Sequence, residues 1–230
     1  MKREYLSPSL MCMDFLHAEE QLKIFEKNFD ALHFDIMDGH FCKNLALSPA
    51  FLRVVSSTCN LPVDAHLMAT KPDDFLVDAV AEAGASCISL HAETINRDGF
   101  RMMNKIEKLG CKKGLVLNPS TPLDCIKYLL GRIDLLTVMT VDVGFAGQSF
   151  IFEMLDKIRE ARRMREENGW HYLIQVDGGC RQEYYRMLHD AGAEAYILGN
   201  AGLFSLDPDL QIACNKMRRQ FSTAIAGGEG

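Results

Sequence analysis

Short apolar runs that alternate with longer amphipathic stretches limit most strongly how this chain can fold. Eight runs read as strands, and the segments between them repeat their apolar residues with helical periodicity. Strands alternating with helices pair in parallel through right-handed crossovers, and eight such units close a (β/α)8 barrel. The predicted strands are residues 5–10, 32–37, 62–68, 87–91, 114–118, 135–140, 172–176 and 195–198.

The 230 residues suffice for one barrel domain, predicted over residues 1–221, and the chain has no linker-like stretch. Residues 222–230, ending in Ala-Gly-Gly-Glu-Gly, are expected to be a disordered tail. An open doubly wound sheet is the alternative, but it would use fewer strands, and no G-x-G-x-x-G follows the first strand. The predicted helices are residues 15–29, 73–83, 100–109, 150–168 and 182–191.

The charge balance argues against some classes of partner. The formal net charge is −6, whereas proteins that bind nucleic acid through phosphate contacts need a basic face. No apolar run reaches the roughly 18 to 20 residues of a membrane span, and the N-terminus lacks the apolar stretch of a signal peptide. The eight cysteines form no C-x-x-C pair, so reduced, buried thiols in a cytoplasmic protein are expected.

Polar side chains occupy one face of the second predicted strand. Because side chains alternate along a strand, His33, Asp35 and Met37 share a face, while Phe34 and Ile36 point the other way. Active sites of barrels form at the C-terminal ends of the strands, and this face would line the lumen there. Burying an imidazole and a carboxylate is costly unless a partner such as a metal ion compensates.

Two further strand ends carry matching residues. His66 shares a face with Met68 at the end of the third strand, and Asp177 follows the seventh. Together with His33 and Asp35 they form a four-residue set suited to one Zn, Fe(II), Mn or Co ion, with Mg disfavoured by the imidazoles. The alternative is two separate structural His–Asp pairs.

Glycines are frequent in the loops after the sixth, seventh and eighth strands. They allow backbone N–H groups to approach an anion, and barrels commonly hold phosphate in the late loops. Three methionines also lie near the predicted strand ends, at Met37, Met68 and Met139. They either fill the core or form an apolar collar around a reacting carbon, and the sequence leaves both interpretations open.

These segments resemble the ribulose-phosphate 3-epimerase family over nearly the whole chain. The matching motifs are Ser7-Pro8-Ser9-Leu10, His33-Phe34-Asp35-Ile36-Met37-Asp38-Gly39, His66-Leu67-Met68, Met139-Thr140-Val141-Asp142, Gly144-Phe145-Ala146-Gly147-Gln148 and Val176-Asp177-Gly178-Gly179. Within the family the chain is most similar to the D-allulose-6-phosphate 3-epimerases. The segments that carry this finer likeness are Leu10-Met11-Cys12-Met13-Asp14, His91-Ala92-Glu93-Thr94-Ile95-Asn96 and Phe145-Ala146-Gly147, where the pentulose enzymes usually carry a second glycine instead of Ala146.

The resemblance implies an isomerase of carbohydrate metabolism that uses one divalent metal held by His33, Asp35, His66 and Asp177. It implies that Asp35 and Asp177 also form the catalytic acid–base pair, and that Ser9 and His66 touch the substrate. The expected reaction converts D-allulose 6-phosphate to D-fructose 6-phosphate through an enediolate. The implied phosphate contacts are Gly144, Phe145, Ala146, Gly147, Gly178, Gly179, Gly199, Asn200 and Ala201.

Three departures from the family pattern fall in the loops. The family usually has proline where Val143 stands, Val-Pro-Asn where Cys42-Lys43-Asn44 stands, and Ser or Thr where Asn200 stands. None touches a predicted ligand. The alternatives are a D-ribulose 5-phosphate to D-xylulose 5-phosphate 3-epimerase and, more distantly, a non-catalytic sugar-phosphate-binding barrel. A homo-oligomer that binds neither nucleic acid nor membrane is expected.

Overall fold

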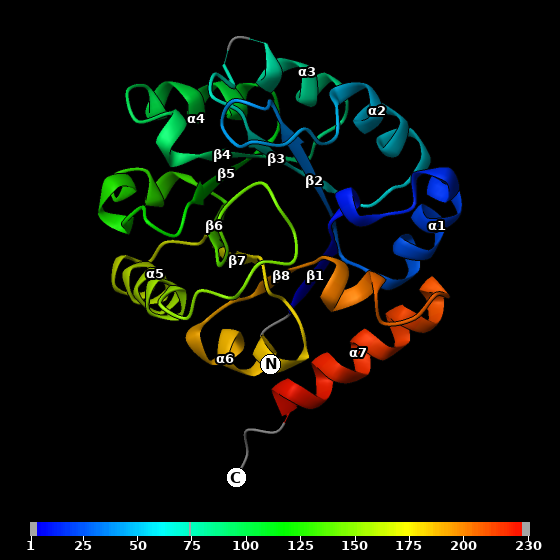
Figure 1. Ribbon diagram of the computed structural model, residues 1–230. Coiled ribbons are helices and arrows are strands. Elements are labelled where there is room, and N and C mark those ends of the chain that lie inside the picture. The colour runs from blue at the N-terminus through cyan, green and yellow to red at the C-terminus, as the bar shows by residue number, and fades with distance from the viewer. Residues whose placement is uncertain (1–3, 74, 227–230) are drawn as a thin grey trace.

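A computed structural model describes residues 4–73 and 75–226. Eight strands pair in parallel in the order β1-β8-β7-β6-β5-β4-β3-β2, and a bridge between Ser9 and His33 joins the two ends of this order. The predicted (β/α)8 barrel is therefore confirmed (Figure 1). The strands are β1 (Tyr5–Pro8), β2 (Leu32–Met37), β3 (Val63–Met68), β4 (Cys87–His91), β5 (Lys112–Leu117), β6 (Leu135–Met139), β7 (Leu173–Asp177) and β8 (Ala195–Leu198).

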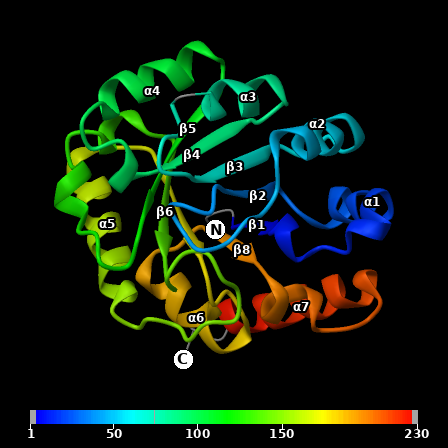
Figure 2. The same ribbon diagram turned by 45° about the horizontal axis from the view of Figure 1, so that its top comes forward.

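The α-helices surround the strands, as both ribbon views show (Figures 1 and 2). They are α1 (Ala18–Asn28), α2 (Pro49–Thr58), α3 (Leu76–Glu82), α4 (Gly99–Lys108), α5 (Met154–Asn168), α6 (Gln182–Ala191) and α7 (Leu210–Ala226). Between β5 and β6 the described chain forms two short 3-10 turns, η4 (Leu123–Ile126) and η5 (Leu130–Arg132), in place of an α-helix.

Several predicted boundaries are wrong by a few residues. The predicted helix over residues 15–29 is divided into the 3-10 turn η2 (Phe15–His17) and α1, because the Asp14 carboxylate accepts the Leu16 N–H and caps a separate turn. The helix predicted from residue 150 begins at Met154, since Phe150 is buried against the rings of Phe152 and Tyr184. The first strand ends at Pro8, and β5 begins two residues earlier than expected.

Two helices were not predicted individually. α2 has a clear start signal, because Ser48 Oγ accepts the Phe51 N–H at 3.4 Å and Pro49 occupies the first turn. α7 continues to Ala226, so the prediction of a disordered tail is wrong for residues 222–226. Its apolar face explains the extension, because Met217 and Phe221 are buried in the core. Residues 227–230 of that predicted tail lie outside the described residues.

The hydrophobic core fills the layer between the strands and the surrounding helices. Outward-facing strand residues such as Phe34, Leu67 and Tyr196 are fully buried against helix residues such as Leu52 and Phe221. This packing fixes each strand in register, so the opposite, inward-facing side chains occupy defined heights in the lumen.

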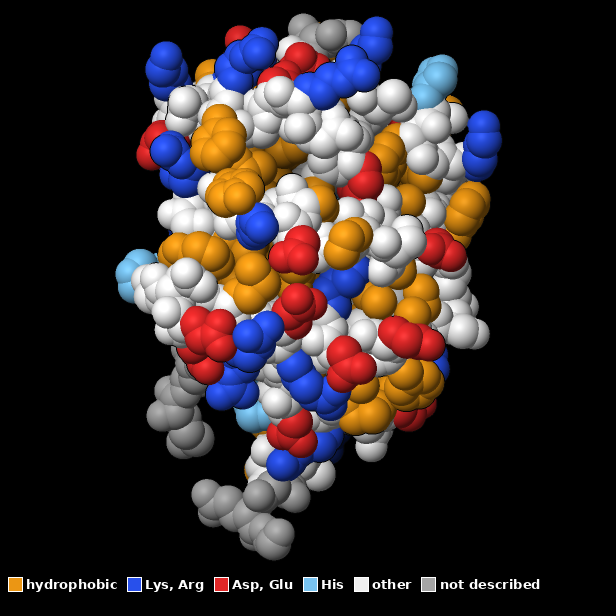
Figure 3. Space-filling model, turned by 90° about the vertical axis from the view of Figure 1, so that its left-hand side faces the viewer, with side chains coloured by type: hydrophobic (Ala, Val, Ile, Leu, Met, Phe, Trp, Pro, Cys, Tyr) orange, Lys and Arg blue, Asp and Glu red, His pale blue; other side chains and the backbone are white. Residues whose placement is uncertain are grey.

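The outer surface carries charges of both signs. On the face shown in Figure 3, Lys and Arg side chains are interspersed with Asp and Glu, and no continuous basic stripe covers that face. Along α5, Arg162–Glu166 and Arg163–Glu167 pair four residues apart. Among the described residues, no helix is long and apolar enough to cross a membrane.

Candidate active site

The strand register stacks the inward-facing polar side chains in layers. His33 lies opposite Asp64, Asp35 opposite His66, and Met37 opposite Met68 in the β2–β3 pairing. Across the barrel, Thr137 pairs with Gln175 and Met139 with Asp177. The predicted common face of His33, Asp35 and Met37 is thus confirmed. Toward the C-terminal ends of the strands, the inward-facing layers change from polar side chains to methionines.

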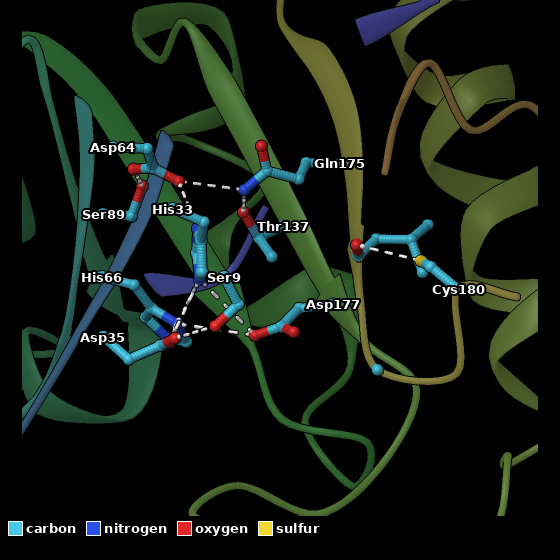
Figure 4. A network of polar contacts seen from close by, with 12 residues as sticks. Ser9, His33, Asp35, Asp64, His66, Ser89, Thr137, Gln175, Asp177 and Cys180 are labelled. Carbon is cyan, nitrogen blue, oxygen red and sulfur yellow. Dashed lines mark hydrogen bonds and ion pairs between the residues drawn. The ribbon is translucent and has the colours of Figure 1, made fainter. Parts of the chain in front are cut away.

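The four predicted ligand residues converge at the C-terminal end of the barrel (Figure 4). One ligand atom from each of His33, Asp35, His66 and Asp177 lies within 4.8 Å of every other. His33 Nε2 is 3.1 Å from Asp35 Oδ1, and His66 Nδ1 is 3.2 Å from the same oxygen. Asp177 Oδ2 lies 3.8 Å from His33 Nε2 and 3.6 Å from His66 Nδ1. The sequence-based alternative of two separate His–Asp pairs does not describe this single cluster.

A carboxylate behind His33 fixes the orientation of its ring. His33 Nδ1 lies 3.1 Å from Asp64 Oδ2, which directs Nε2 toward the cluster. Asp64 in turn accepts hydrogen bonds from Ser89 Oγ at 2.5 Å and Gln175 Nε2 at 2.9 Å, and Gln175 also donates to Thr137 (Figure 4). Such a partner is the usual support of a metal-binding imidazole, because it sets the tautomer.

The chemistry of this donor set fits a divalent cation. Two ring nitrogens, His33 Nε2 and His66 Nδ1, lie 3.3 Å apart and face two carboxylate oxygens in a buried setting. Electron-rich atoms gathered this closely repel one another unless a cation or protons lie among them. Two imidazoles and two carboxylates match the preferences of Zn, Fe(II), Mn and Co.

The two carboxyl groups of the cluster differ in their pKa directions. Burial raises the pKa of Asp35, but the adjacent His33 and His66 outweigh it and hold the pKa below its ordinary range. Burial raises the pKa of Asp177, His33 opposes the rise, and the charge of Asp35 adds to it, so this pKa lies above its ordinary value. The two carboxyl groups are therefore shifted in opposite directions by their surroundings.

A cavity of about 300 Å³ opens above the cluster. Asp35 and Asp177 line it, whereas His33 and His66 are buried below, with 1% and 0% exposure. Ser9 also lines the cavity and donates from Oγ to Asp35 Oδ2 at 2.8 Å. Three methionines are each buried and each line the cavity, a placement that agrees with both core filling and a collar: Met37, Met68 and Met139.

The glycine-rich loops line the same cavity. All nine residues expected to contact phosphate belong to its wall: Gly144, Phe145, Ala146, Gly147, Gly178, Gly179, Gly199, Asn200 and Ala201. Gly178 has a φ of 102°, and a Cβ there would lie 2.7 Å from Val141 Cγ2, so this turn requires glycine. Gln148 holds the loop after β6 by donating to the carbonyls of Asp142 and Phe145.

Sequence reasoning missed several residues of the site. Asp64 could have been found, since it shares its strand face with His66 one layer lower. Arg181, in the loop between β7 and α6, also lines the cavity. His91 lies behind His66, with 2.8 Å between their Nε2 atoms; its segment had been noted for its similarity but no role was assigned.

Comparison with known proteins identifies the family. The model of the ribulose-phosphate 3-epimerase family matches residues 5–203. Ribulose-phosphate 3-epimerase of Escherichia coli (strain K12) is 37% identical over 224 residues, which cover 96% of this chain and 98% of the relative. Ribulose-phosphate 3-epimerase of Bacillus subtilis (strain 168) is 39% identical over 198 residues, covering 85% and 90%.

Solved structures with low sequence similarity share the architecture. A mutant tryptophan synthase α-subunit from Pyrococcus furiosus aligns with a TM-score of 0.69 and 12% identity, over 99% of this chain and 100% of that one. This likeness supports the barrel fold alone. The match to the family model and the relatives of nearly full length show that the chain belongs to the ribulose-phosphate 3-epimerase family.

Proposed function

We propose that this chain is a metal-dependent isomerase that inverts C3 of a ketose phosphate, interconverting D-ribulose 5-phosphate and D-xylulose 5-phosphate. The observation that carries the proposal is the convergence of Asp35 and Asp177 with two imidazoles beneath a cavity lined by glycine loops. The names of the curated relatives support the pentulose substrate, in preference to the hexulose expected from the finer sequence likeness.

The reaction requires two proton carriers on opposite sides of one carbon. C3 is adjacent to the ketone, so loss of its proton gives an enediolate, and reprotonation on the other face inverts the centre. Asp35, with its lowered pKa, is the ionised group that accepts the proton, while Asp177, with its raised pKa, holds the proton to be returned. In the reverse reaction the two roles exchange.

An aspartate with a pKa of about 3.9 or lower is a weak base for a carbon acid, so acid–base geometry alone is insufficient. A divalent ion held by His33, Asp35, His66 and Asp177 would supply Lewis-acid stabilisation of the negative charge that develops on the substrate oxygens. Zn, Fe(II), Mn and Co fit this donor set better than Mg.

The remaining walls of the cavity assist in two ways. Met37, Met68 and Met139 present apolar surface that carries no exchangeable proton, so they exclude water from the enediolate without competing as acids. Backbone N–H groups of the glycine loops bind the phosphate at a distance from the reacting carbon. Ser9, hydrogen-bonded to Asp35, contacts the substrate beside the base.

D-Allulose 6-phosphate, giving D-fructose 6-phosphate, is the second candidate substrate. A specific observation favours it, because Ala146 lines the cavity where the pentulose enzymes usually carry glycine. The added methyl group changes the wall of the cavity at the phosphate-binding end. The position of the phosphate there determines how long a sugar fits between the phosphate and the metal site. Both substrates use the same metal and the same carboxyl pair.

A parallel assay tests the proposal. The two ketose phosphates are offered to one preparation whose metal content is measured, before and after exhaustive chelation and after addition of Zn, Mn, Co or Fe(II). We expect C3 epimerisation that chelation abolishes and a metal restores, with the higher kcat/KM for D-ribulose 5-phosphate. A higher kcat/KM for D-allulose 6-phosphate would overturn the substrate assignment, and undiminished activity after chelation would overturn the metal requirement.

We also propose that the enzyme is a cytoplasmic homo-oligomer. Light scattering of the purified protein tests the assembly, with a monomeric mass as the contradicting result. The two curated relatives compared above are epimerases by name, which favours an enzyme over a non-catalytic barrel.

A further inference from the structure

The candidate ligand His66 is supported from behind by a second histidine. His91 ends β4, is fully buried, and meets His66 edge to edge, with ring centroids 4.9 Å apart and ring planes 29° apart. The two Nε2 atoms are 2.8 Å apart, which is a hydrogen-bond distance. One of these nitrogens must therefore carry a proton and the other must present its lone pair.

The opposite edge of His66 determines which nitrogen is protonated. His66 Nδ1 faces Asp35 Oδ1 at 3.2 Å and Asp177 Oδ2 at 3.6 Å, so it is the atom that would bind a cation. A neutral imidazole that offers Nδ1 as a ligand carries its proton on Nε2. His91 Nε2 must then accept, and the proton of His91 resides on Nδ1.

Glu93 lies at the other edge of His91. His91 Nδ1 is 3.3 Å from Glu93 Oε2, and neither atom has another partner among the described residues. The second carboxylate oxygen, Oε1, accepts the Asn118 N–H at 3.1 Å and the Thr121 hydroxyl. The carboxylate is therefore held in place by the loop after β5, with Oε2 left for His91.

That loop is itself anchored. Lys157 on α5 donates from Nζ to the carbonyls of Asn118, Pro119 and Thr121 at 2.9, 2.7 and 2.8 Å. The chain of contacts thus runs from a half-buried lysine through a loop and Glu93 to His91 and His66. His33, by comparison, contacts its carboxylate Asp64 directly.

We propose that His91 and Glu93 are positioning residues that fix the ring orientation and tautomer of His66, so that its Nδ1 lone pair points at the metal. The inference rests on the proposed function, because it assumes that His66 is a metal ligand. Each imidazole of the site then has its own carboxylate, direct for His33 and relayed through His91 for His66.

Zinc affinity of purified variants, measured by competition with a chromophoric chelator, tests the relay. His91→Leu removes the acceptor, and we expect roughly a ten- to hundred-fold weaker Kd for zinc. His91→Gln keeps a side-chain oxygen that can accept from His66 Nε2, so it should recover part of that loss. Partial recovery by Gln is not expected from a merely space-filling role of His91.

Glu93→Gln is the second variant. Asn118 N–H and His91 Nδ1–H each need an acceptor on residue 93, and an amide offers only one oxygen. One of the two donors is then left without its acceptor, His91 is held less firmly, and we expect zinc affinity to fall again. Glu107→Gln is the matched control, because Glu107 is an exposed glutamate paired with Lys113 on the surface. It should bind zinc as the wild type does.

Nitrogen-15 NMR of the zinc-loaded wild type does not depend on the folding of any variant. We expect His91 in the Nδ1–H tautomer and His66 protonated on Nε2. An Nε2–H tautomer of His91, or unchanged zinc affinity in His91→Leu and Glu93→Gln, would overturn the relay. If the wild type binds none of Zn, Mn, Co or Fe(II), the proposed metal requirement is contradicted. If the wild type binds zinc and the variants bind it equally tightly, only the relay is contradicted.

Discussion

Asp35 and Asp177 carry the same functional group in opposite electrostatic settings. The carboxyl of Asp35 is enclosed by two imidazoles and the Ser9 hydroxyl, whereas that of Asp177 meets the charge of Asp35 from across the barrel. Opposed pKa directions in one site are the usual mark of separate acid and base roles.

Replacing either carboxyl with an amide tests those roles. Asp35→Asn and Asp177→Asn should each lower kcat by about 10²–10⁴-fold, because an amide cannot carry the proton. Steady-state kinetics with metal analysis of each variant provides the measurement, since both residues are also candidate ligands. Asp156→Asn, a change in an exposed surface pair on α5, is the control. A variant of Asp35 or Asp177 that turns over at the wild-type rate would refute the two-carboxylate scheme.

Glu93 should contribute to stability in a way that depends on pH. Burial raises its pKa, but His91, Thr121 and the local backbone outweigh this and lower the pKa to about 2 from an ordinary value of 4.5. A carboxyl group whose folded pKa is depressed contributes stability that is complete only well above pH 4.5 and is lost as the pH falls toward 2.

Urea unfolding of the wild type and Glu93→Gln at several pH values checks this linkage. The difference in unfolding free energy should be constant above about pH 5.5 and should shrink, by an amount on the order of 1 kcal/mol, at pH 3.5. A difference that stays constant or grows on acidification would show that the carboxylate is not stabilised by its folded surroundings.

At the scale of elements, the π-helical turn η6 (Asn200–Phe204) after β8 lies against the loop after β7. Gly202 makes this contact, since a Cβ there would lie 2.0 Å from the Cys180 carbonyl oxygen. Gly199 begins the same loop, but a Cβ there would make only an ordinary van der Waals contact, 3.7 Å from Cys12 Sγ. The two glycines therefore serve different purposes.

Gly202→Ala should destabilise the protein by about 1–3 kcal/mol, because the backbone must move to admit the methyl group. Gly199→Ala is the matched control and should unfold within about 0.5 kcal/mol of the wild type. Thermal unfolding of both variants provides the comparison. Equal melting temperatures for Gly202→Ala and the wild type would mean that η6 does not pack closely on the β7 loop.

Strand alternation predicted the inner face of β2 and β3 because a strand repeats every two residues, whatever surrounds it. The same rule would have found Asp64, which was overlooked because it lies one layer below the strand end. The support of His66 by His91 and Glu93 could not be predicted this way. It depends on the loop after β5 and on Lys157, which approach only in the folded barrel.

Helix ends were predicted less well than strands. The start of α1 depends on the Asp14 cap, and the start of α5 depends on burial of Phe150, and both are decided by contacts outside the periodic pattern. α7 extends through Ala226 for a similar reason, since Phe221 packs on Tyr185 and Tyr196. Local composition near residue 222 carries no sign of that packing.

At the scale of the whole molecule, the candidate ligands come from β2, β3 and β7, which are distant in sequence and lie on different sides of the lumen. A cation bound by all four would therefore stabilise the closed barrel and not only the site. Binding to the folded state alone adds about 2.7 kcal/mol at a metal concentration 100 times the Kd.

For a chain of this length, each kcal/mol corresponds to roughly 2–4 °C in Tm, so saturating metal should raise the Tm of chelated protein by about 5–11 °C. Differential scanning calorimetry with Zn, Mn or Co added to chelator-treated protein measures the shift. Asp177→Asn removes one ligand and should lose most of it, while Asp156→Asn should retain it. A wild-type Tm that none of these ions raises would show that the four residues do not hold a metal.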